Sequence, residues 1–359
     1  AINKEALRLL RLFGNTTSKK VTPSVGAEQE YFIVDRETYL KRKDLIFTGR
    51  TLFGAMPPKG QEMDDHYFGA IKERVSNSMK DLDIELWKLG IPAKTEHNEA
   101  APAQQEIDLR FCDALSAADA VVTARLVIKE TAHAQGVHAS FMPKPIEGQP
   151  GSAMHVHQSL FDEHGNAFAD ANDPDGMGLS SVAKSYIAGL LKYAPEYMLI
   201  TNQYVNSYKR LVPGFDAPVL VSWGSRNRSA MVRVPRYKPG KPSSTRIAVR
   251  SVDSAANPYL AYAAMLGAGL KGIEEGLELC APVEENLFNL SQAEIAERGL
   301  KYLPRDLSQA VDEFEKSELM HEILGDVICE NLISAKRAEW EEYRAHVSSW
   351  EIDRYLARL

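Results

Sequence analysis

Glu28 and Glu30 lie in the segment G-A-E-Q-E-Y-F-I-V-D, whose apolar and aromatic residues predict a β-strand. Residues two apart on a strand face the same side, so the two carboxylates project together. Such close like charges repel each other unless a cation neutralises them, and hard divalent ions such as Mg²⁺ or Mn²⁺ prefer carboxylate oxygens. The pair therefore indicates a metal site. A solvated pair on an edge strand is the alternative interpretation.

Two further short segments carry groups of the same kind. Glu99 and Glu106 lie in H-N-E-A-A-P-A-Q-Q-E-I-D, and His155 and His157 lie in G-S-A-M-H-V-H-Q-S-L. Four carboxylates and two imidazoles on strand-like segments predict a site for more than one metal ion, with phosphoryl transfer or metal-assisted hydrolysis as its natural chemistry. Alternatively, the two histidines are partly buried polar residues held by hydrogen bonds.

Phosphate chemistry also needs cations, and residues 226–250 are rich in them. Arg246 and Arg250 lie four apart on a predicted strand and therefore on one face. Arginine is favoured where carboxylate or phosphate is bound in a planar, bidentate manner, whereas surface salt bridges are the alternative role. The cations of this segment are Arg226, Arg228, Arg233, Arg236, Lys238, Lys241, Arg246 and Arg250. The chain lacks a G-x-x-x-x-G-K-[ST] motif, so we expect no P-loop.

Composition limits the class of protein. The chain has 359 residues, of which 44% are hydrophobic and 25% charged, and its formal net charge is −7. These values are typical of a soluble globular protein with a sizeable core, and they argue against a nucleic-acid partner. We find no run of membrane-spanning length and no signal-peptide core. The cysteines, Cys112, Cys280 and Cys329, show neither zinc spacing nor a disulfide framework, which fits a reducing cytoplasm.

Hydrophobic periodicity and capping residues predict the elements that must position these groups. We expect a surface loop over 36–64, strands within 138–161, and a polar loop over 162–178. The predicted helices are 66–89, Ser116 to Gly136, 180–200, and 257–279, with further helices after a loop at 282–305. Because strands and helices are mixed rather than alternating, we expect an α+β fold with a mainly antiparallel sheet flanked by helices.

Longer motifs resemble the glutamine synthetase family. They are N-S-Y-K-R-L-V-P-G-F-D-A-P, W-G-S-R-N-R-S-A-M-V-R-V-P and A-A-N-P-Y-L-A-Y-A-A-M-L, together with the Glu and His segments above. The resemblance extends from about residue 20 over nearly the whole chain. Residues 25 to about 107 are more similar to the type III branch, with T-G-R-T-L-F-G and D-D-H-Y-F-G, and the chain from Leu109 onward resembles type I. The sequence is therefore interpreted as a mosaic.

The resemblance implies a catalytic domain with a curved sheet and an ATP-dependent amide synthesis, in which L-glutamate is phosphorylated and ammonium displaces the phosphate. It implies two or three Mg²⁺ or Mn²⁺ ions per site, one at Glu30, Glu99 and Glu106 and another at Glu28 and His155. The implied glutamate contacts are Gly151, Arg210 and Arg250, and the implied catalytic residues are Asp216 and Arg228. The implied ATP contacts are Phe111, His157, Ser159, Arg228, Arg233, Lys241 and Arg246.

Several positions depart from the family pattern. Ala248 stands where the family has a metal-binding Glu in R-I-E-V-R, and Asp216 is one methylene shorter than the family's Glu. Pro150 and Ala153 replace small residues beside the glutamate. Phe288 occupies the place of a tyrosine that some type I enzymes adenylylate, so we expect no control of that kind.

The resemblance also implies domain organisation and assembly. We expect residues 1–20 to be a connecting helix or linker and residues 21–359 the catalytic domain, without the family's N-terminal β-grasp domain. A homo-oligomeric ring, a dodecamer of two hexamers, is implied in the same way. The expected function is a glutamine synthetase-type ligase. Alternatives are a γ-glutamyl ligase for an organic amine, or a catalytically impaired subunit, which Ala248 favours.

Overall fold

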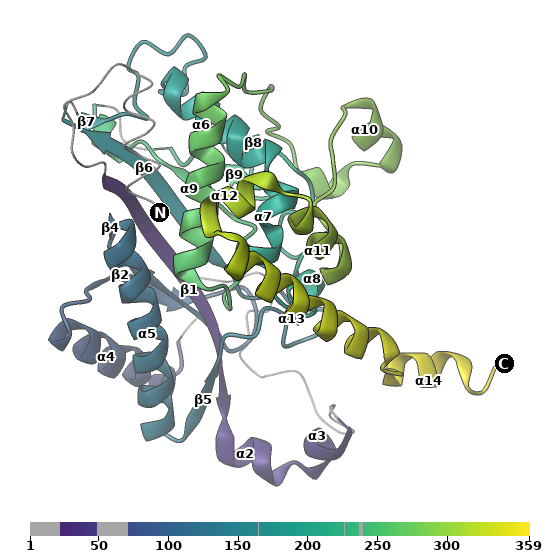
Figure 1. Ribbon diagram of the computed structural model, residues 1–359. Helices are drawn as coiled ribbons and strands as arrows, with labels where there is room; N and C mark the ends of the chain where they lie inside the picture. Colours follow the sequence, from purple (N-terminus) through teal and green to yellow (C-terminus); the bar gives the residue numbers. More distant parts are fainter. Residues whose placement is uncertain (1–21, 49–70, 164, 226, 237–239) are drawn as a thin grey trace.

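The structure is a computed structural model that describes residues 22–48, 71–163, 165–225, 227–236 and 240–359 (Figure 1). The predicted connecting helix over 1–20 lies outside these ranges. So do Arg226, Lys238 and the part of the predicted loop that follows residue 48.

A mostly antiparallel sheet forms the centre of the described chain, and its main path runs β2-β3-β1-β6-β10-β9-β8. The long strand β1 (Thr22–Asp35) lies in the middle, between β3 (Gln104–Leu109) and β6 (Met154–Asp162). Only the pair β8–β9 is parallel among the described strands. The remaining strands are β2 (Ala93–Asn98), β4 (Cys112–Asp113), β5 (Val137–Ser140), β7 (Gly165–Asn166), β8 (Trp223–Gly224), β9 (Val232–Arg233) and β10 (Ile247–Val249). The predicted α+β class is confirmed.

Helices cover the sheet in two groups (Figure 1). Helices α4 and α5 lie beside β1 and β2, while α6, α7, α9 and α11 to α13 form a second group on the other side of β1. Their bounds are α2 (Arg36–Lys41), α3 (Lys43–Thr48), α4 (Glu73–Lys88), α5 (Ala114–Ala134), α6 (Ser181–Lys192), α7 (Ala194–Thr201), α8 (Ser207–Arg210), η3 (Pro242–Ser244), α9 (Pro258–Glu274), η4 (Leu287–Asn289), α10 (Gln292–Glu297), α11 (Leu307–Glu315), α12 (Glu318–Leu324), α13 (Asp326–Ala345) and α14 (Ser349–Tyr355). Within the described residues, none of the helices combines the length and apolar character needed to span a bilayer.

Capping explains where the helices begin. Asn257 is the N-cap of α9, because its side chain accepts hydrogen bonds from the amides of Tyr259 and Leu260. The helix predicted to begin with Ser116 as its N-cap begins earlier: Asp113 is the N-cap of α5, and its carboxylate accepts from the amide of Ser116.

Two further predictions need correction. The predicted loop begins with two short helices, α2 and α3, since Asp35 accepts from the Thr38 amide and thereby caps α2. The predicted helix over 180–200 is two helices, α6 and α7, with Pro195 in the first turn of α7, where the missing N–H costs nothing.

Close helix packing accounts for a glycine motif inside α9. The segment G-A-G-L-K-G at 267–272 has the G-x-G-x-x-G spacing of a dinucleotide-binding loop, but here it lies in the middle of a helix. A Cβ atom at Gly272 would overlap the carbonyl oxygen of Ser185 and the backbone of Gly189. The absence of a side chain at Gly272 therefore lets α9 approach α6.

Candidate active site

The sheet register brings the predicted carboxylates and imidazoles together from three neighbouring strands. Glu28 on β1 lies opposite Asp108 on β3 and opposite His155 on β6. Glu30, two residues further along β1, lies opposite Glu106. Because side chains alternate along each strand, these groups share one face of the sheet.

The first cluster consists of Glu30, Glu99 and Glu106, whose nearest carboxylate oxygens all lie within 4.8 Å of one another. Glu30 and Glu106 are each only 6% exposed. Burial, with the charge of Glu99, raises the pKa of Glu30 to about 8, and burial and the neighbouring carboxylates raise the pKa of Glu106 well above its usual value. Three buried oxygen ligands fit a hard divalent cation, which would remove this repulsion.

Hydrogen bonds fix the orientation of Glu30. Its Oε2 atom accepts from the Ala153 amide at 2.7 Å and from Gln104 Nε2 at 3.0 Å. The same Gln104 amide donates to the Gly151 carbonyl at 3.1 Å. The loop before β6 is therefore tied to the cluster.

Glu28 sits between two imidazoles. Its Oε2 lies 3.0 Å from His155 Nδ1, and its Oε1 lies 2.7 Å from His157 Nε2. Burial by itself would raise the pKa of Glu28, but the hydrogen bonds from the two histidines lower it well below its ordinary value. His157 Nδ1 in turn accepts from Arg246 Nε at 3.0 Å. Arg246, His157, Glu28 and His155 thus form one continuous chain of contacts.

His155 has an open coordination position. Burial lowers its pKa to about 3, so the imidazole is neutral. With its proton on Nδ1, where Glu28 accepts it, the lone pair lies on Nε2, and Nε2 is buried without a hydrogen-bond partner in the described structure. This atom fits a second metal ion. Ala248, which stands where the resemblance implies a third ligand, lies on β10 opposite His157 and offers only a methyl group.

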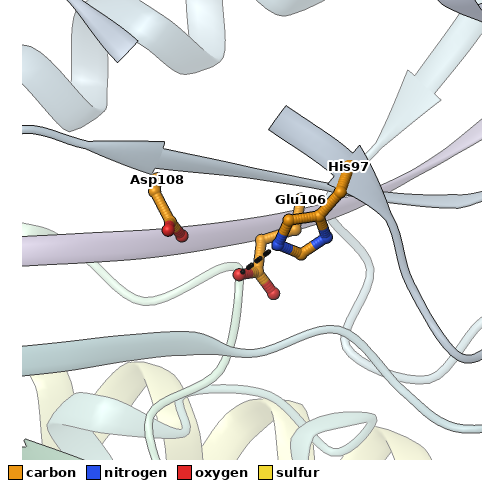
Figure 2. Close-up of side chains that lie close together, drawn as sticks. All are labelled: His97, Glu106 and Asp108. Atoms are coloured by element: carbon orange, nitrogen blue, oxygen red, sulfur yellow. Dashed lines mark ion pairs between the residues drawn. The ribbon is translucent and has the colours of Figure 1, made fainter. Parts of the chain in front are cut away.

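Sequence reasoning missed His97 and Asp108. His97 Nε2 lies 3.4 Å from Glu106 Oε1, and ligand atoms of His97, Glu106 and Asp108 lie within 4.8 Å of one another (Figure 2). The strand period could have found both, because each lies two residues from a predicted ligand, Glu99 or Glu106.

A cleft of about 850 Å³ adjoins Glu28. The predicted nucleotide contacts Phe111, His157, Ser159 and Arg246 line it, and Phe111 is 72% exposed. Arg228, Arg233 and Lys241 are not among its lining residues. Lining residues that sequence reasoning did not predict include Lys94, Asp108, Arg110, Ser243, Ser244 and Thr245.

A smaller pocket, of about 30 Å³, has Glu30 in its lining. Gly151, Arg210 and Asp216 line it, together with Glu99 and His155. Arg210 is only 2% exposed, and its guanidinium donates to the carbonyls of Arg250 and Ser251, both at 2.9 Å. Some of the N–H donors of this guanidinium are therefore already used by main-chain carbonyls. Arg250 is not among the residues that line the pocket.

A group of arginines provides the positive charge of the site. Burial lowers the pKa of Arg233, and the charges of Arg250, Arg228 and Arg246 lower it further. Arg250 Nε donates to the Arg228 carbonyl at 3.0 Å, and Arg233 Nε is buried without a partner in the described structure. Guanidinium groups that repel one another near the carboxylate of Glu28 suit an anionic ligand that carries cations.

Comparisons with known proteins agree with this arrangement. Residues 8–355 match the family model of the glutamine synthetase catalytic domain. Glutamine synthetase of Mycolicibacterium smegmatis is 48% identical over 301 residues, 84% of this chain and 67% of that protein. That of Mycobacterium tuberculosis is 52% identical over 269 residues, 75% of this chain and 60% of that protein.

A solved structure, the GmaS/ADP complex in conformation 1, aligns with a TM-score of 0.78 at 27% identity, over 97% of this chain and 76% of that one. The fold and the matched residues define a catalytic domain of the glutamine synthetase type. The chain belongs to the glutamine synthetase family. It spans about 60 to 67% of the length of the mycobacterial relatives.

Proposed function

We propose that this chain ligates ammonia to the side-chain carboxylate of L-glutamate, with ATP as the phosphoryl donor and glutamine, ADP and phosphate as products. The observation that carries the proposal is that Glu28 and Glu30, which lie two residues apart on β1, line two different spaces, the large cleft and the small pocket. Glu28 lines the cleft, and Glu30 and Glu99 line the pocket. A metal ion held there would face both a nucleotide and a second, smaller substrate.

Two kinds of ligand set would hold the ions. Glu30, Glu99 and Glu106 would bind one Mg²⁺ or Mn²⁺, and Glu28 with His155 Nε2 would bind another. When bound, these ions would neutralise phosphate charge and polarise phosphoryl oxygens. The likeness to the GmaS/ADP complex supports the cleft as the nucleotide site.

Side chains of this protein would orient the substrates. Arg246 holds the His157 ring at the cleft, while Phe111 and Ser159 contact the nucleotide. Gly151, Arg210 and Arg250 bind glutamate. A Cβ at residue 151 would overlap the Pro143 carbonyl oxygen and crowd Arg210, so the pocket requires glycine there.

Arginines would stabilise the charge that develops during phosphoryl transfer. Arg228 and Arg233, with Lys241, lie toward the transferred group, and the unpartnered Nε of Arg233 offers a free donor. In the first step a side-chain carboxylate oxygen of glutamate attacks the γ-phosphorus of ATP, the bond from that phosphorus to the bridging oxygen breaks, and ADP leaves. In the second step the nitrogen lone pair of ammonia attacks the side-chain carbonyl carbon, the carbon–oxygen bond to phosphate breaks, and phosphate leaves. Asp216 takes the proton that the nitrogen loses.

The wider organisation follows from the same proposal. Residues 21–359 act as the catalytic domain and residues 1–20 as its connecting segment. The protein works as a homo-oligomeric ring in the cytoplasm, without nucleic-acid or membrane partners. Membership of the family supports these assignments.

A second candidate is a γ-glutamyl ligase for an organic amine. The shorter Asp216 lines the small pocket and leaves more room there than a glutamate would. ADP release tests both: the protein is assayed with glutamate and Mg²⁺ or Mn²⁺, with and without ammonium, methylamine and larger amines. Ammonium-dependent release is expected. Release with an organic amine alone would favour the second candidate, and no release with any amine would contradict both.

A further inference from the structure

Two loops frame the small pocket. Pro150 and Gly151 belong to the loop over residues 143–151, and Phe215 and Asp216 belong to the loop over residues 212–216. All four line the same space as Glu30. The contact that holds one loop against the other therefore sets the shape of this pocket.

The second loop has few polar anchors of its own. Within the described chain, residues 213–216 form no hydrogen bond to another segment. Asp216 has a φ of 54°, a left-handed conformation that is uncommon for residues other than glycine. Such a conformation persists only where the surroundings enforce it.

Lys144 has a backbone that is fixed from two sides. It lies between Pro143 and Pro145, which restrict its conformation. The side-chain amide of Asn206 accepts from the Lys144 N–H at 2.8 Å and donates to the Lys144 carbonyl at 3.1 Å. Asn206 directly precedes α8, which ends at Arg210. The base of the Lys144 side chain is therefore anchored to the segment that carries a proposed substrate contact.

The Lys144 side chain contacts both loops. Its ammonium group lies 3.9 Å from the centre of the Phe215 ring and donates a hydrogen bond to the Gln149 carbonyl. Within the described chain it forms no ion pair with a carboxylate. A lysine ammonium over an aromatic face is attracted by the electrons of the ring. The ammonium group of Lys144 therefore interacts with the Phe215 ring and the Gln149 carbonyl.

We propose that Lys144 is a positioning residue, which holds the Phe215–Asp216 loop over the pocket by binding the Phe215 ring and the Gln149 carbonyl together. The consequence for turnover rests on the proposed function, in which Asp216 takes a proton from the attacking nitrogen. Without the contact, Asp216 would leave the place where the nitrogen is bound, while the nucleotide cleft would keep its shape.

Three variants test the proposal. Lys144→Met keeps the length of the side chain and removes its charge, and Lys144→Arg keeps a cation that also binds aromatic faces. Lys192→Met is the matched control, because Lys192 lies 4.9 Å from the Tyr193 ring and pairs with Glu275 away from both pockets. Thermal melting shows whether each variant is folded.

The first readout is hydrogen exchange, without substrate, of the two protected amides at the ends of the loop: the Val212 N–H, which donates to the Arg210 carbonyl at 2.8 Å, and the N–H of the buried Ala217. Exchange should be about 2- to 10-fold faster in Lys144→Met, the range expected for one cation–π contact. It should stay unchanged in Lys192→Met and return toward the parent rate in Lys144→Arg. Equal exchange rates in Lys144→Met and the parent would overturn the proposal. This measurement does not depend on catalytic turnover.

The second readout separates positioning from general damage. Lys144→Met should raise the KM for ammonium about 2- to 10-fold and leave the KM for ATP unchanged. A parallel rise in the KM for ammonium and the KM for ATP would reject the positioning role. Faster exchange with an unchanged KM for ammonium would reject it as well. A parent protein without turnover would reject the proposed function alone, and the exchange rates would then decide on the contact.

Discussion

At the residue scale, the chemistry of the site follows from the electrostatic repulsion among three neighbouring carboxylates. Glu30, Glu99 and Glu106 are close and largely buried, and among the described residues no lysine or arginine forms an ion pair with them. The guanidinium of Arg210, which lines the same pocket as Glu30, donates to backbone carbonyls. Folding three such groups together costs free energy unless an ion compensates. The carboxylates are therefore better suited to binding a cation than to stabilising the fold.

Removal of one carboxylate should weaken metal binding. Glu106→Gln should lower the affinity for Mn²⁺ by at least about 10-fold, a loss that even an outer-shell change can cause. The free Mn²⁺ signal in electron paramagnetic resonance measures this affinity. Glu96→Gln is the control, because Glu96 lies on β2 opposite Ile107, with its side chain on the other face of the sheet. Equal Mn²⁺ affinity in Glu106→Gln and Glu96→Gln would contradict the assignment.

Ala248 is the residue that limits the second ion. A glutamate at this position would project beside His157 from β10 and supply the missing carboxylate. Ala248→Glu should raise the number of tightly bound Mn²⁺ ions, counted in the same titration, whereas the neutral Ala248→Gln should not. If both variants bind as many ions as the parent chain, then Glu28 and His155 do not form a metal site that lacks only this ligand.

At the element scale, the sheet register does most of the positioning, and the loops complete it. The sequence patterns predicted β1, β6 and α9 and the pairing of side chains on one strand face. They did not predict which strands are neighbours, because register depends on contacts between distant residues such as Glu30 and Glu106. For the same reason the contact of His97 with Glu106 was not predicted, since it exists only across a strand pair, although the spacing of His97 from Glu99 could have marked it as a candidate.

Capping residues show a second limit of prediction. Both Asp113 and Ser116 are good N-caps, and only the backbone geometry decides between them. The short helices α2 and α3 were missed because each is too short to display a hydrophobic period.

The loop over 162–178 should be sensitive to acid. Burial of Asp173 would raise its pKa, but Lys184 and the amides of Asp175, Met177 and Leu179 lower it on balance. Because the folded-state pKa lies below the unfolded one, this stabilisation is present above about pH 4 and is lost as the pH falls through the folded value. Asp173→Asn should remove that part of the acid dependence of urea unfolding. Asp175→Asn, at a carboxylate that is 63% exposed, should leave it nearly unchanged. Identical acid profiles for Asp173→Asn and the parent would contradict this account.

At the scale of the whole molecule, one fold places neighbouring carboxylates in the walls of two spaces: Glu28 in a cleft of about 850 Å³, and Glu30 and Glu99 in a small pocket. Membership of the glutamine synthetase family and the GmaS-like fold agree with that arrangement. Both ligase candidates make one statement about atoms that separates them from simple ATP hydrolysis: an oxygen of the glutamate side chain becomes an oxygen of the released phosphate. Direct hydrolysis of ATP would take that oxygen from water instead.

The most direct test follows this oxygen. The protein is incubated with ATP, ammonium, Mn²⁺ and glutamate labelled with ¹⁸O in its side-chain carboxylate, and the phosphate is analysed by mass spectrometry. The account predicts one ¹⁸O atom in each phosphate and one in each glutamine. Phosphate that is released without label would contradict a γ-glutamyl phosphate intermediate and, with it, the proposed function.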